Sequence, residues 1–402
     1  MIEVLETLGL QTEDEIALLN FNSYLQIPSV QPNVNYDTCV EFLGTMAESL
    51  QLPMQVLNLV EGKPIVLMTW MGTEPALPAI LLNSHMDVSP VVISEWSHNP
   101  FAVEIEDQNI YARGAQDSKC IGIQYLEAVR RLKRSKTVLK RTIYLSYMPD
   151  AEIGGLKGMG AFTDWEDFGK LNIGFALDSG MATLGDKFVA FNGEKYAWNI
   201  RVCCQGTSGD AELLLDDTPG ERMSRVLQKF FAFRTMEMEK LTANPDWTLA
   251  NVISINLTKI EGGGRRNMVP SEFVLYFDCR IPFERMDVDE LEPTMDQWCH
   301  DVSNSVLIDY TLQELPINPT RINDPYWVTF EKAVEEVEVQ MFPGRTDSRH
   351  LRNAEIPVVS FSPIINTPVR LHGHDEHIGI QTFLDGITIY CRILRELGEL
   401  ME

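Results

Sequence analysis

Leu81-Leu-Asn-Ser-His-Met-Asp-Val-Ser-Pro90 is the stretch that decides the fold. An apolar strand, residues 79–82, leads into a polar tip that carries His85 and Asp87. In open α/β sheets, ligands bind beyond the carboxyl ends of the strands. A histidine there suits a metal ligand, and the aspartate suits its orienting partner, because it can accept the ring N–H that the metal leaves unused. By itself, a His-x-Asp motif at the end of a strand is weak evidence for a metal ligand. Such residues more often have an ordinary structural role in a loop.

The composition is strongly acidic. The 402 residues carry a formal net charge of −25, and 45% of them are hydrophobic. Nucleic acids and anionic membrane surfaces bind basic patches, so the charge argues against both as partners. The densest basic run, residues 130–136, ends a predicted helix, where cations are locally favoured. The length is sufficient for two or three domains with a large core.

The termini and cysteines indicate where the protein resides. Residues 1–9 lack the basic start and long apolar core of a signal peptide, and no apolar run reaches membrane-spanning length. The seven cysteines are an odd number without zinc-finger spacing, so we interpret them as reduced thiols. We therefore expect a cytoplasmic protein.

The first half of the chain has an α/β pattern. Apolar residues at helical spacing predict helices over residues 12–27, 36–50 and 118–133. Strands are predicted at 54–60, 64–70, 141–148 and 173–177. The last two are largely apolar, as in strands buried on both faces of a sheet. This alternation predicts a mostly parallel sheet.

The pattern changes near Gly193. Strands are predicted at 198–204, 252–260, 271–280 and 306–312, with helices at 219–239 and 287–303. Beyond them the α/β pattern resumes with a helix at 326–337, a strand at 357–361 and a helix at 378–397. We therefore predict a discontinuous α/β domain, residues 1–191 and 313–402, that contains an inserted α+β domain, residues 192–312.

Four metal-ligating side chains follow predicted strands or lie in loops expected on one rim: His85, Asp117, Glu152 and His374. A carboxylate that bridges two metals, flanked by histidine and glutamate ligands, makes a two-zinc hydrolytic centre. Spacing does not prove that they converge, because they are far apart in the sequence.

A family resemblance supplies the missing connection. The chain resembles the zinc-dependent metallopeptidase family that includes aminoacylases, carboxypeptidases and dipeptidases. The stretches that carry the resemblance run in family order over nearly the whole chain, among them Asn83-Ser-His-Met-Asp-Val88, Tyr111-Ala-Arg-Gly-Ala-Gln-Asp117, residues 149–155, Thr346-Asp-Ser-Arg349 and His372-Gly-His-Asp-Glu376. The resemblance implies a zinc-binding α/β domain with an inserted lid that usually forms a homodimer. It also implies a small N-acylated amino acid, or a similar carboxylate, as the ligand.

The resemblance also implies roles for single residues. His85 would bind the first zinc, with Asp87 as its orienter. Asp117 would bridge the two zincs, and Glu152 and His374 would bind the second. Arg349 and Asn267 would hold the carboxylate and acyl region of the substrate. For Asn267, a plain turn role after three glycines is an open alternative, and His372 and His377 are interpreted as neighbours of the site, not ligands.

Three positions depart from the family pattern. Where the pattern has the glutamate that acts as general base, the chain has Ala151. Where it has the third ligand of the first zinc, the chain has Ser179, and the adjacent Asp178 is an alternative ligand. Where the lid has a histidine that stabilises the oxyanion, the chain has Asp210, which would repel an anion.

Two functional hypotheses follow. The first is a catalytically disabled aminoacylase-like protein that retains a single zinc per chain, with the other site weakened, and a carboxylate-binding cleft. The alternative is an active cytosolic amidohydrolase that releases an L-amino acid from its N-acyl form, in which Asp150 or the metal centre unaided replaces the base. A metal-free interaction role is a third possibility.

Overall fold

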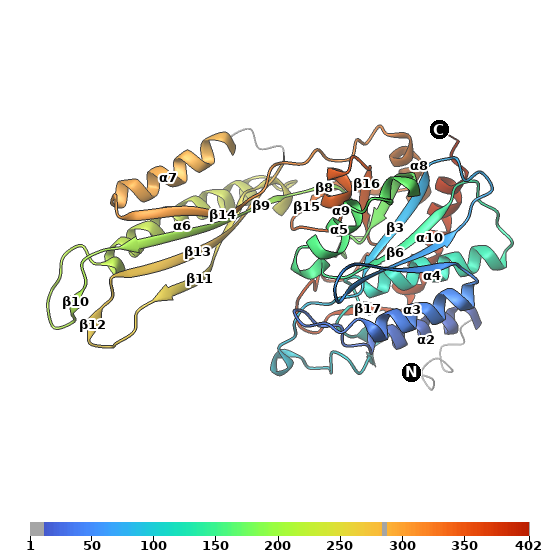
Figure 1. Ribbon diagram of the computed structural model, residues 1–402, viewed down its shortest axis with the longest axis horizontal. Coiled ribbons are helices and arrows are strands. Elements are labelled where there is room, and N and C mark those ends of the chain that lie inside the picture. The colour runs from blue at the N-terminus through green and yellow to red at the C-terminus, as the bar shows by residue number, and fades with distance from the viewer. Residues whose placement is uncertain (1–11, 284–287, 402) are drawn as a thin grey trace. The chain divides into compact units, whose positions relative to one another are not determined.

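The computed structural model describes residues 12–283 and 288–401, which form two compact units (Figure 1). The first unit comprises the described residues up to 192 together with 319–340 and 346–401. The second comprises the described residues from 193 to 318 and residues 341–345. The sequence analysis placed the insert at 192–312. Residues 1–9, considered above for a signal peptide, lie outside the described residues.

An eight-stranded mixed sheet is the centre of the first unit. Its order is β1-β2-β6-β3-β7-β16-β8-β15. The four central strands β6, β3, β7 and β16 are parallel, whereas β1, β2 and β8 pair antiparallel with their neighbours. The strands are β1 (Met54–Val60), β2 (Lys63–Trp70), β3 (Ala79–His85), β6 (Ile143–Met148), β7 (Ile173–Asp178), β8 (Phe188–Glu194), β15 (Val337–Phe342) and β16 (Val358–Phe361). The predicted mostly parallel sheet is confirmed.

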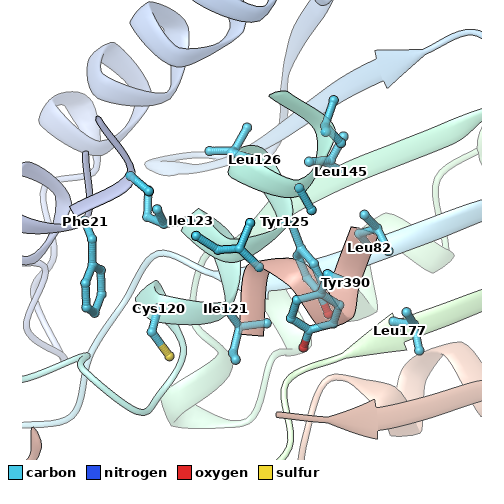
Figure 2. Packing of buried hydrophobic residues seen from close by; sticks show 14 of the residues in the cluster. Phe21, Leu82, Cys120, Ile121, Ile123, Tyr125, Leu126, Leu145, Leu177 and Tyr390 are labelled. Atoms are coloured by element: carbon cyan, nitrogen blue, oxygen red, sulfur yellow. The ribbon is translucent and has the colours of Figure 1, made fainter. Parts of the chain in front are cut away.

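Both faces of this sheet are covered. Alternate residues of β3 point to opposite sides, so Ile80 and Leu82 join one core cluster and Leu81 joins another. Helices on the first side are α2 (Thr12–Leu25), α3 (Asp37–Leu50), α4 (Lys119–Arg134), α8 (Pro325–Val334) and α10 (Ile380–Glu399). Figure 2 shows side chains of α4 packed between strand residues such as Leu145 and the α10 residue Tyr390. The opposite face holds α5 (Ala161–Thr163) and α9 (Ser348–Asn353).

A small three-stranded sheet lies beside the helices of the first unit. It consists of β4 (Glu104–Glu106), β5 (Asn109–Tyr111) and β17 (His377–Gly379), in the order β17-β5-β4. These strands are three residues long, too short to produce a period-two hydrophobic pattern, and the sequence analysis missed them. They matter because β5 leads toward Asp117 and β17 follows the histidine-rich segment 372–377.

The second unit is an α+β layer. Its four-stranded antiparallel sheet, in the order β11-β13-β9-β14, packs against α6 (Pro219–Ala243) and α7 (Leu291–Val302). The strands are β9 (Tyr196–Gln205), β11 (Ser254–Gly262), β13 (Glu272–Ile281) and β14 (Val306–Gln313). Thr218 caps α6, accepting the Glu221 N–H while the Glu221 side chain accepts the Thr218 N–H. The predicted helix start at residue 287 lies outside the described residues.

A further pair of strands, β10 (Gly209–Asp210) and β12 (Met268–Val269), completes the second unit and was not predicted. Among the described residues, no helix is both long and apolar enough to cross a membrane.

Candidate metal centre

His85 ends the central strand β3, at the edge of the sheet where parallel strands present their carboxyl ends. Its Nε2 lies 3.1 Å from Asp117 Oδ1. Its Nδ1 lies 2.9 Å from the carbonyl oxygen of Asp87 and 3.5 Å from Asp87 Oδ1. The ring therefore turns Nε2 toward the acidic cluster and Nδ1 toward Asp87, which is the orientation expected of a ligand histidine and its orienter.

Glu152 comes to the same place from the end of β6. It lies in a short 3₁₀ turn, Ala151–Ile153, that follows Asp150 in left-handed conformation (φ 63°). The Asp87 carboxylate fixes this turn, accepting the N–H of Ala151 at 3.3 Å and of Glu152 at 3.1 Å. Ser89 Oγ donates to Glu152 Oε2 at 2.6 Å. His85, Asp117 and Glu152 offer ligand atoms that all lie within 4.8 Å of one another.

His374 was the predicted ligand in this loop, but His372 is the histidine that lies beside the carboxylates in the structure. His372 Nε2 lies 2.9 Å from Glu152 Oε2 and 3.6 Å from Asp117 Oδ2. Both His372 and His374 are exposed, and the cluster of ligand atoms within 4.8 Å of one another consists of His85, Asp117 and Glu152. The backbone turns sharply here, because His372 and Asp375 both have positive φ (58° and 51°). His377 packs against Tyr111, away from the carboxylates, with a centroid distance of 4.8 Å.

The electrostatics of the cluster favour positive charge. Burial lowers the pKa of His85, but its hydrogen bonds with Asp117 and Asp87 outweigh burial and raise the pKa well above the usual range. Hydrogen bonds with Asp117 and Glu152 raise the pKa of His372 to about 10. Burial acts to raise the pKa of Asp117, yet the two histidines prevail and lower it. The lowered pKa of Asp117 and the raised pKa of both histidines show a local field that favours positive charge, as at a cation site.

This donor set fits zinc, because imidazole nitrogens and carboxylate oxygens are its ordinary ligands in hydrolytic sites. His85, Asp117, Glu152 and His372 would hold it, and bound zinc supplies Lewis acidity for the attack of water on a carbonyl. A cleft of about 280 Å³ opens beside these residues. It is lined by Gln31, Pro32, Ser89, Pro90, Glu152, Ile153 and His372.

Ala151, predicted from the motif resemblance to stand where the family pattern has a carboxylate, has only a methyl side chain. The neighbouring Asp150 is 1% exposed and has other partners. Its Oδ1 accepts from Lys63 Nζ at 2.5 Å, from Gln31 Nε2 at 3.1 Å and from Tyr36 Oη at 3.2 Å. All three donors bind Oδ1, and Oδ2 is buried without a hydrogen-bond partner, so the carboxylate is shielded from solvent water. Asp150 therefore fits a structural role better than the replacement base considered above.

Ser179 directly follows β7 and is buried. Its N–H donates to Asp178 Oδ1 at 2.9 Å. Asn83 Nδ2 also donates to that oxygen at 2.9 Å, and Ser348 Oγ donates to Oδ2 at 2.7 Å. Both oxygens of Asp178 therefore accept hydrogen bonds from protein groups.

A second buried carboxyl group, Asp347, lies next to Asp178. Asn83 Nδ2, which donates to Asp178, is 3.5 Å from Asp347 Oδ2. Burial and the nearby charge of Asp178 raise the pKa of Asp347 well above its usual range, and burial also raises the pKa of Asp178. The folded protein therefore keeps protons that the unfolded chain releases near pH ~4. The free energy of unfolding should therefore fall as the pH rises from about 4 toward the raised pKa of Asp347.

We expect Asp347→Asn to reduce this loss of stability. In metal-free protein, the melting temperature of the variant should exceed that of the unaltered chain by a margin that grows from about pH 4 to about pH 8. Thermal unfolding followed by circular dichroism at several pH values measures the margin. Asp385→Asn, at an exposed position on α10, is the control and should follow the unaltered chain. A constant margin for Asp347→Asn would contradict the assignment.

The remaining predicted residues lie in different units. Arg349 is half-buried on α9, and the next residue, His350, lies with Nε2 3.2 Å from the carbonyl oxygen of Gly154. This contact places α9 against the loop that carries Glu152. Asn267 and Asp210 belong to the second unit, where the Asn267 carbonyl accepts the N–H of Ala211 at 3.0 Å. The β10–β12 pairing brings Asp210 and Asn267 close together.

Comparisons with known proteins agree with this architecture. The model of peptidase family M20/M25/M40 matches residues 81–396. The chain belongs to this family. Rat aminoacylase-1A is 41% identical over 385 residues, which covers 94% of each chain. Human aminoacylase-1 is 38% identical over 393 residues, which covers 96% of each chain. The chain is therefore an aminoacylase-1 homologue within the M20 family, and the resemblance inferred from its motifs is confirmed.

Solved M20 structures show the same fold at low identity. A metallo-carboxypeptidase from Sulfolobus solfataricus has a TM-score of 0.72 at 18% identity and covers 97% of this chain and 100% of its own. A dinuclear metal-binding peptidase from Bacillus subtilis has a TM-score of 0.66 at 13% identity, covering 95% and 98%.

Proposed function

We propose that this M20 protein binds zinc through His85, Asp117, Glu152 and His372, binds an N-acyl-L-amino acid beside the metal, and hydrolyses its amide bond slowly. The observation that carries the proposal is the combination of the His85, Asp117 and Glu152 donor cluster, with His372 beside it, and an alanine at position 151. A positioned general base typically contributes about 10²–10⁴-fold to the rate. Retention of the donors with loss of this carboxylate favours binding over rapid turnover, and Ser179 would weaken one of two metal positions.

The relatives support the class of ligand. Those named aminoacylase-1 match nearly the whole chain, and the Thr346-Asp-Ser-Arg349 segment contains a guanidinium group suited to a carboxylate. In the proposed complex Arg349 binds the substrate carboxylate bidentately.

Arg349→Leu should therefore weaken binding of an N-acetyl amino acid by about 10–100-fold, which corresponds to loss of hydrogen bonds between charged groups. Isothermal titration with zinc-loaded protein measures the dissociation constant. Arg392→Leu removes an arginine from the surface ion pair with Glu335 and is the matched control. Equal affinities for the two variants would exclude Arg349 from the carboxylate site.

A second candidate function is rapid N-acyl-L-amino-acid hydrolysis. The comparisons by themselves favour it, because 41% identity over 94% of the chain is shared with a protein named aminoacylase-1A. In this case the metal centre would activate water without a neighbouring carboxylate, since Asp150 already accepts three hydrogen bonds.

We also propose that the second unit mediates formation of a homodimer. Strands β11 and β14 are the edges of its four-stranded sheet, and the α6 residue Phe231 is 43% exposed. Light scattering on the full chain gives the oligomeric state. A cytoplasmic location remains a prediction, and it is supported by seven free, buried cysteines.

Turnover of the unaltered protein distinguishes the two functions. Zinc content, binding of N-acetyl amino acids and release of the free amino acid are measured on one preparation of the full chain. Tight zinc and ligand binding with little release supports the first candidate. Turnover that is rapid, within the range of ordinary enzymes (kcat about 1–10³ s⁻¹), supports the second. A stable protein that holds no zinc would contradict both.

A further inference from the structure

A buried ion pair joins the two loops that carry Asp117 and His372. Arg113 Nη1 donates to Glu376 Oε2 at 2.7 Å, and the two side chains are 2% and 1% exposed. Arg113 lies four residues before Asp117, and Glu376 lies four residues after His372. A charge pair with so little contact with water needs further hydrogen bonds to offset its desolvation.

Backbone N–H groups of the Asp117 loop supply those hydrogen bonds. Glu376 accepts the N–H of Gln116 on Oε1 at 2.6 Å and the N–H of Asp117 on the same oxygen at 3.2 Å. The N–H of Gly114 lies 3.2 Å from each carboxylate oxygen. The Glu376 side chain therefore binds the backbone of the very residue whose carboxylate lies between the two histidines.

Arg113 extends the network to the other ligand segments. Its Nη2 donates to the carbonyl oxygens of His372 at 3.3 Å and Pro90 at 3.4 Å. Pro90 lies five residues after His85, in the segment that follows β3. The guanidinium group also lies over the Trp96 ring, 5.2 Å from its centroid.

Gln116 ties the same two loops together a second time. Its Nε2 donates to the carbonyl oxygens of Pro368 at 3.0 Å and His377 at 2.8 Å, and its Oε1 accepts the N–H of Arg370 at 3.0 Å. These contacts lie on both sides of His372 in the sequence. The position of His372 relative to Asp117 is therefore set by side chains that do not themselves face the ligand cluster.

We propose that Glu376 is the positioning residue of the metal centre, which fixes the separation of Asp117 and His372 before any metal binds. This proposal rests on the proposed zinc site and goes beyond it, because it assigns the geometry of the site to a carboxylate that would not touch the metal. Binding sites require their groups to be held within about 0.5 Å of the productive position. A single carboxylate that accepts from Arg113 and from three backbone N–H groups provides that constraint.

Glu376→Gln tests the proposal. Glutamine has the same shape, but its NH₂ group would face an N–H or guanidinium donor where an oxygen now accepts. We expect the zinc affinity, measured by competition with a chromophoric chelator, to fall by about 10–100-fold, as for partners that orient metal ligands. The absorption bands of bound Co²⁺ should shift because the ligand geometry changes.

Glu127→Gln is the matched control. Glu127 is also buried, and it accepts from Asn20 Nδ2 at 2.8 Å and Arg130 Nε at 2.9 Å in the middle of α4. This control should leave zinc affinity and the Co²⁺ spectrum unchanged, even where it lowers the melting temperature. Should Glu376→Gln fail to fold, Arg113→Lys keeps the charge and removes the contacts with Pro90 and His372, and an intermediate loss of zinc affinity is expected.

Hydrogen exchange separates failure of this proposal from failure of the proposed function. In metal-free protein, the amides of Gly114, Gln116 and Asp117 should exchange faster in Glu376→Gln than in the unaltered chain and in Glu127→Gln. Faster exchange without zinc binding by the unaltered chain would uphold the positioning role and refute the zinc site. Zinc binding that is equally tight in Glu376→Gln and Glu127→Gln would overturn the positioning role.

Discussion

Ala151→Glu is expected to raise the rate of hydrolysis of N-acetyl amino acids by about 10²–10⁴-fold over the unaltered chain, at saturating zinc. The reason is local. Position 151 lies in the 3₁₀ turn that also contains Glu152, and the Asp87 carboxylate accepts the N–H groups of both residues. Because this turn is already fixed, a glutamate at 151 would add a carboxylate beside the metal ligands without rearranging the backbone.

The control for this gain is Ile153→Glu. Ile153 belongs to the same turn, lines the same cleft and is 55% exposed, so the variant adds an equal charge at a different position. Steady-state kinetics with a panel of N-acetyl amino acids measures kcat and KM for both variants and the unaltered chain. A general base should raise kcat with little effect on KM, whereas a merely acidic cleft should change KM in both variants.

Each outcome identifies a different cause. Rapid hydrolysis by the unaltered chain would show that the missing carboxylate is dispensable and would favour the second candidate function. A silent Ala151→Glu variant that still binds zinc would locate the defect at Ser179 or Asp210 as well. Restored activity in the double variant Ala151→Glu, Ser179→Glu would then show that the defect lies at the first metal position.

The fold could be predicted from sequence because its largest elements have long, regular patterns. The central strands β6 and β7 are largely apolar, and α4 and α10 have clear helical spacing, so the mostly parallel sheet could be predicted. The three-residue strands β4, β5 and β17 have no such pattern. Strand β5 pairs with β17, which lies more than 250 residues further along the chain. No local sequence pattern could predict this pairing.

The candidate site was predicted in part for the same reason. His85 and Glu152 follow long buried strands, so their place at the sheet edge could be inferred, and the structure brings both to Asp117. The segment 372–377 contains three histidines in six residues and no strand that would tell which one points inward. In the structure, His372 and Asp375 have positive φ, so the loop turns at these residues. A hydrophobic pattern does not predict such left-handed turns. The roles of Arg349 and Asn267 remain predictions.

His372→Ala and His374→Ala should therefore differ sharply, although only one residue separates the two positions. His372 Nε2 lies 2.9 Å from Glu152 Oε2 and 3.6 Å from Asp117 Oδ2, which is the only reason to favour it over His374, since both side chains are exposed. Loss of an orienting partner already costs about 10–100-fold in metal affinity, so loss of a ligand itself should cost more than about 100-fold. His374→Ala should bind zinc as the unaltered chain does. Chelator competition gives the affinities, and elemental analysis gives the zinc content per chain.

The comparison also tests which residues make up the site. With Ser179 in place of a ligand, His85 and Asp117 alone provide a poor zinc position, so Glu152 and His372 should dominate the tighter binding. His372→Ala should consequently remove most of the bound zinc, and circular dichroism should show that the fold is kept, since 60% of the His372 side chain is exposed. If His374→Ala loses zinc and His372→Ala does not, the histidine loop must rearrange when metal binds, and the assignment of His372 fails.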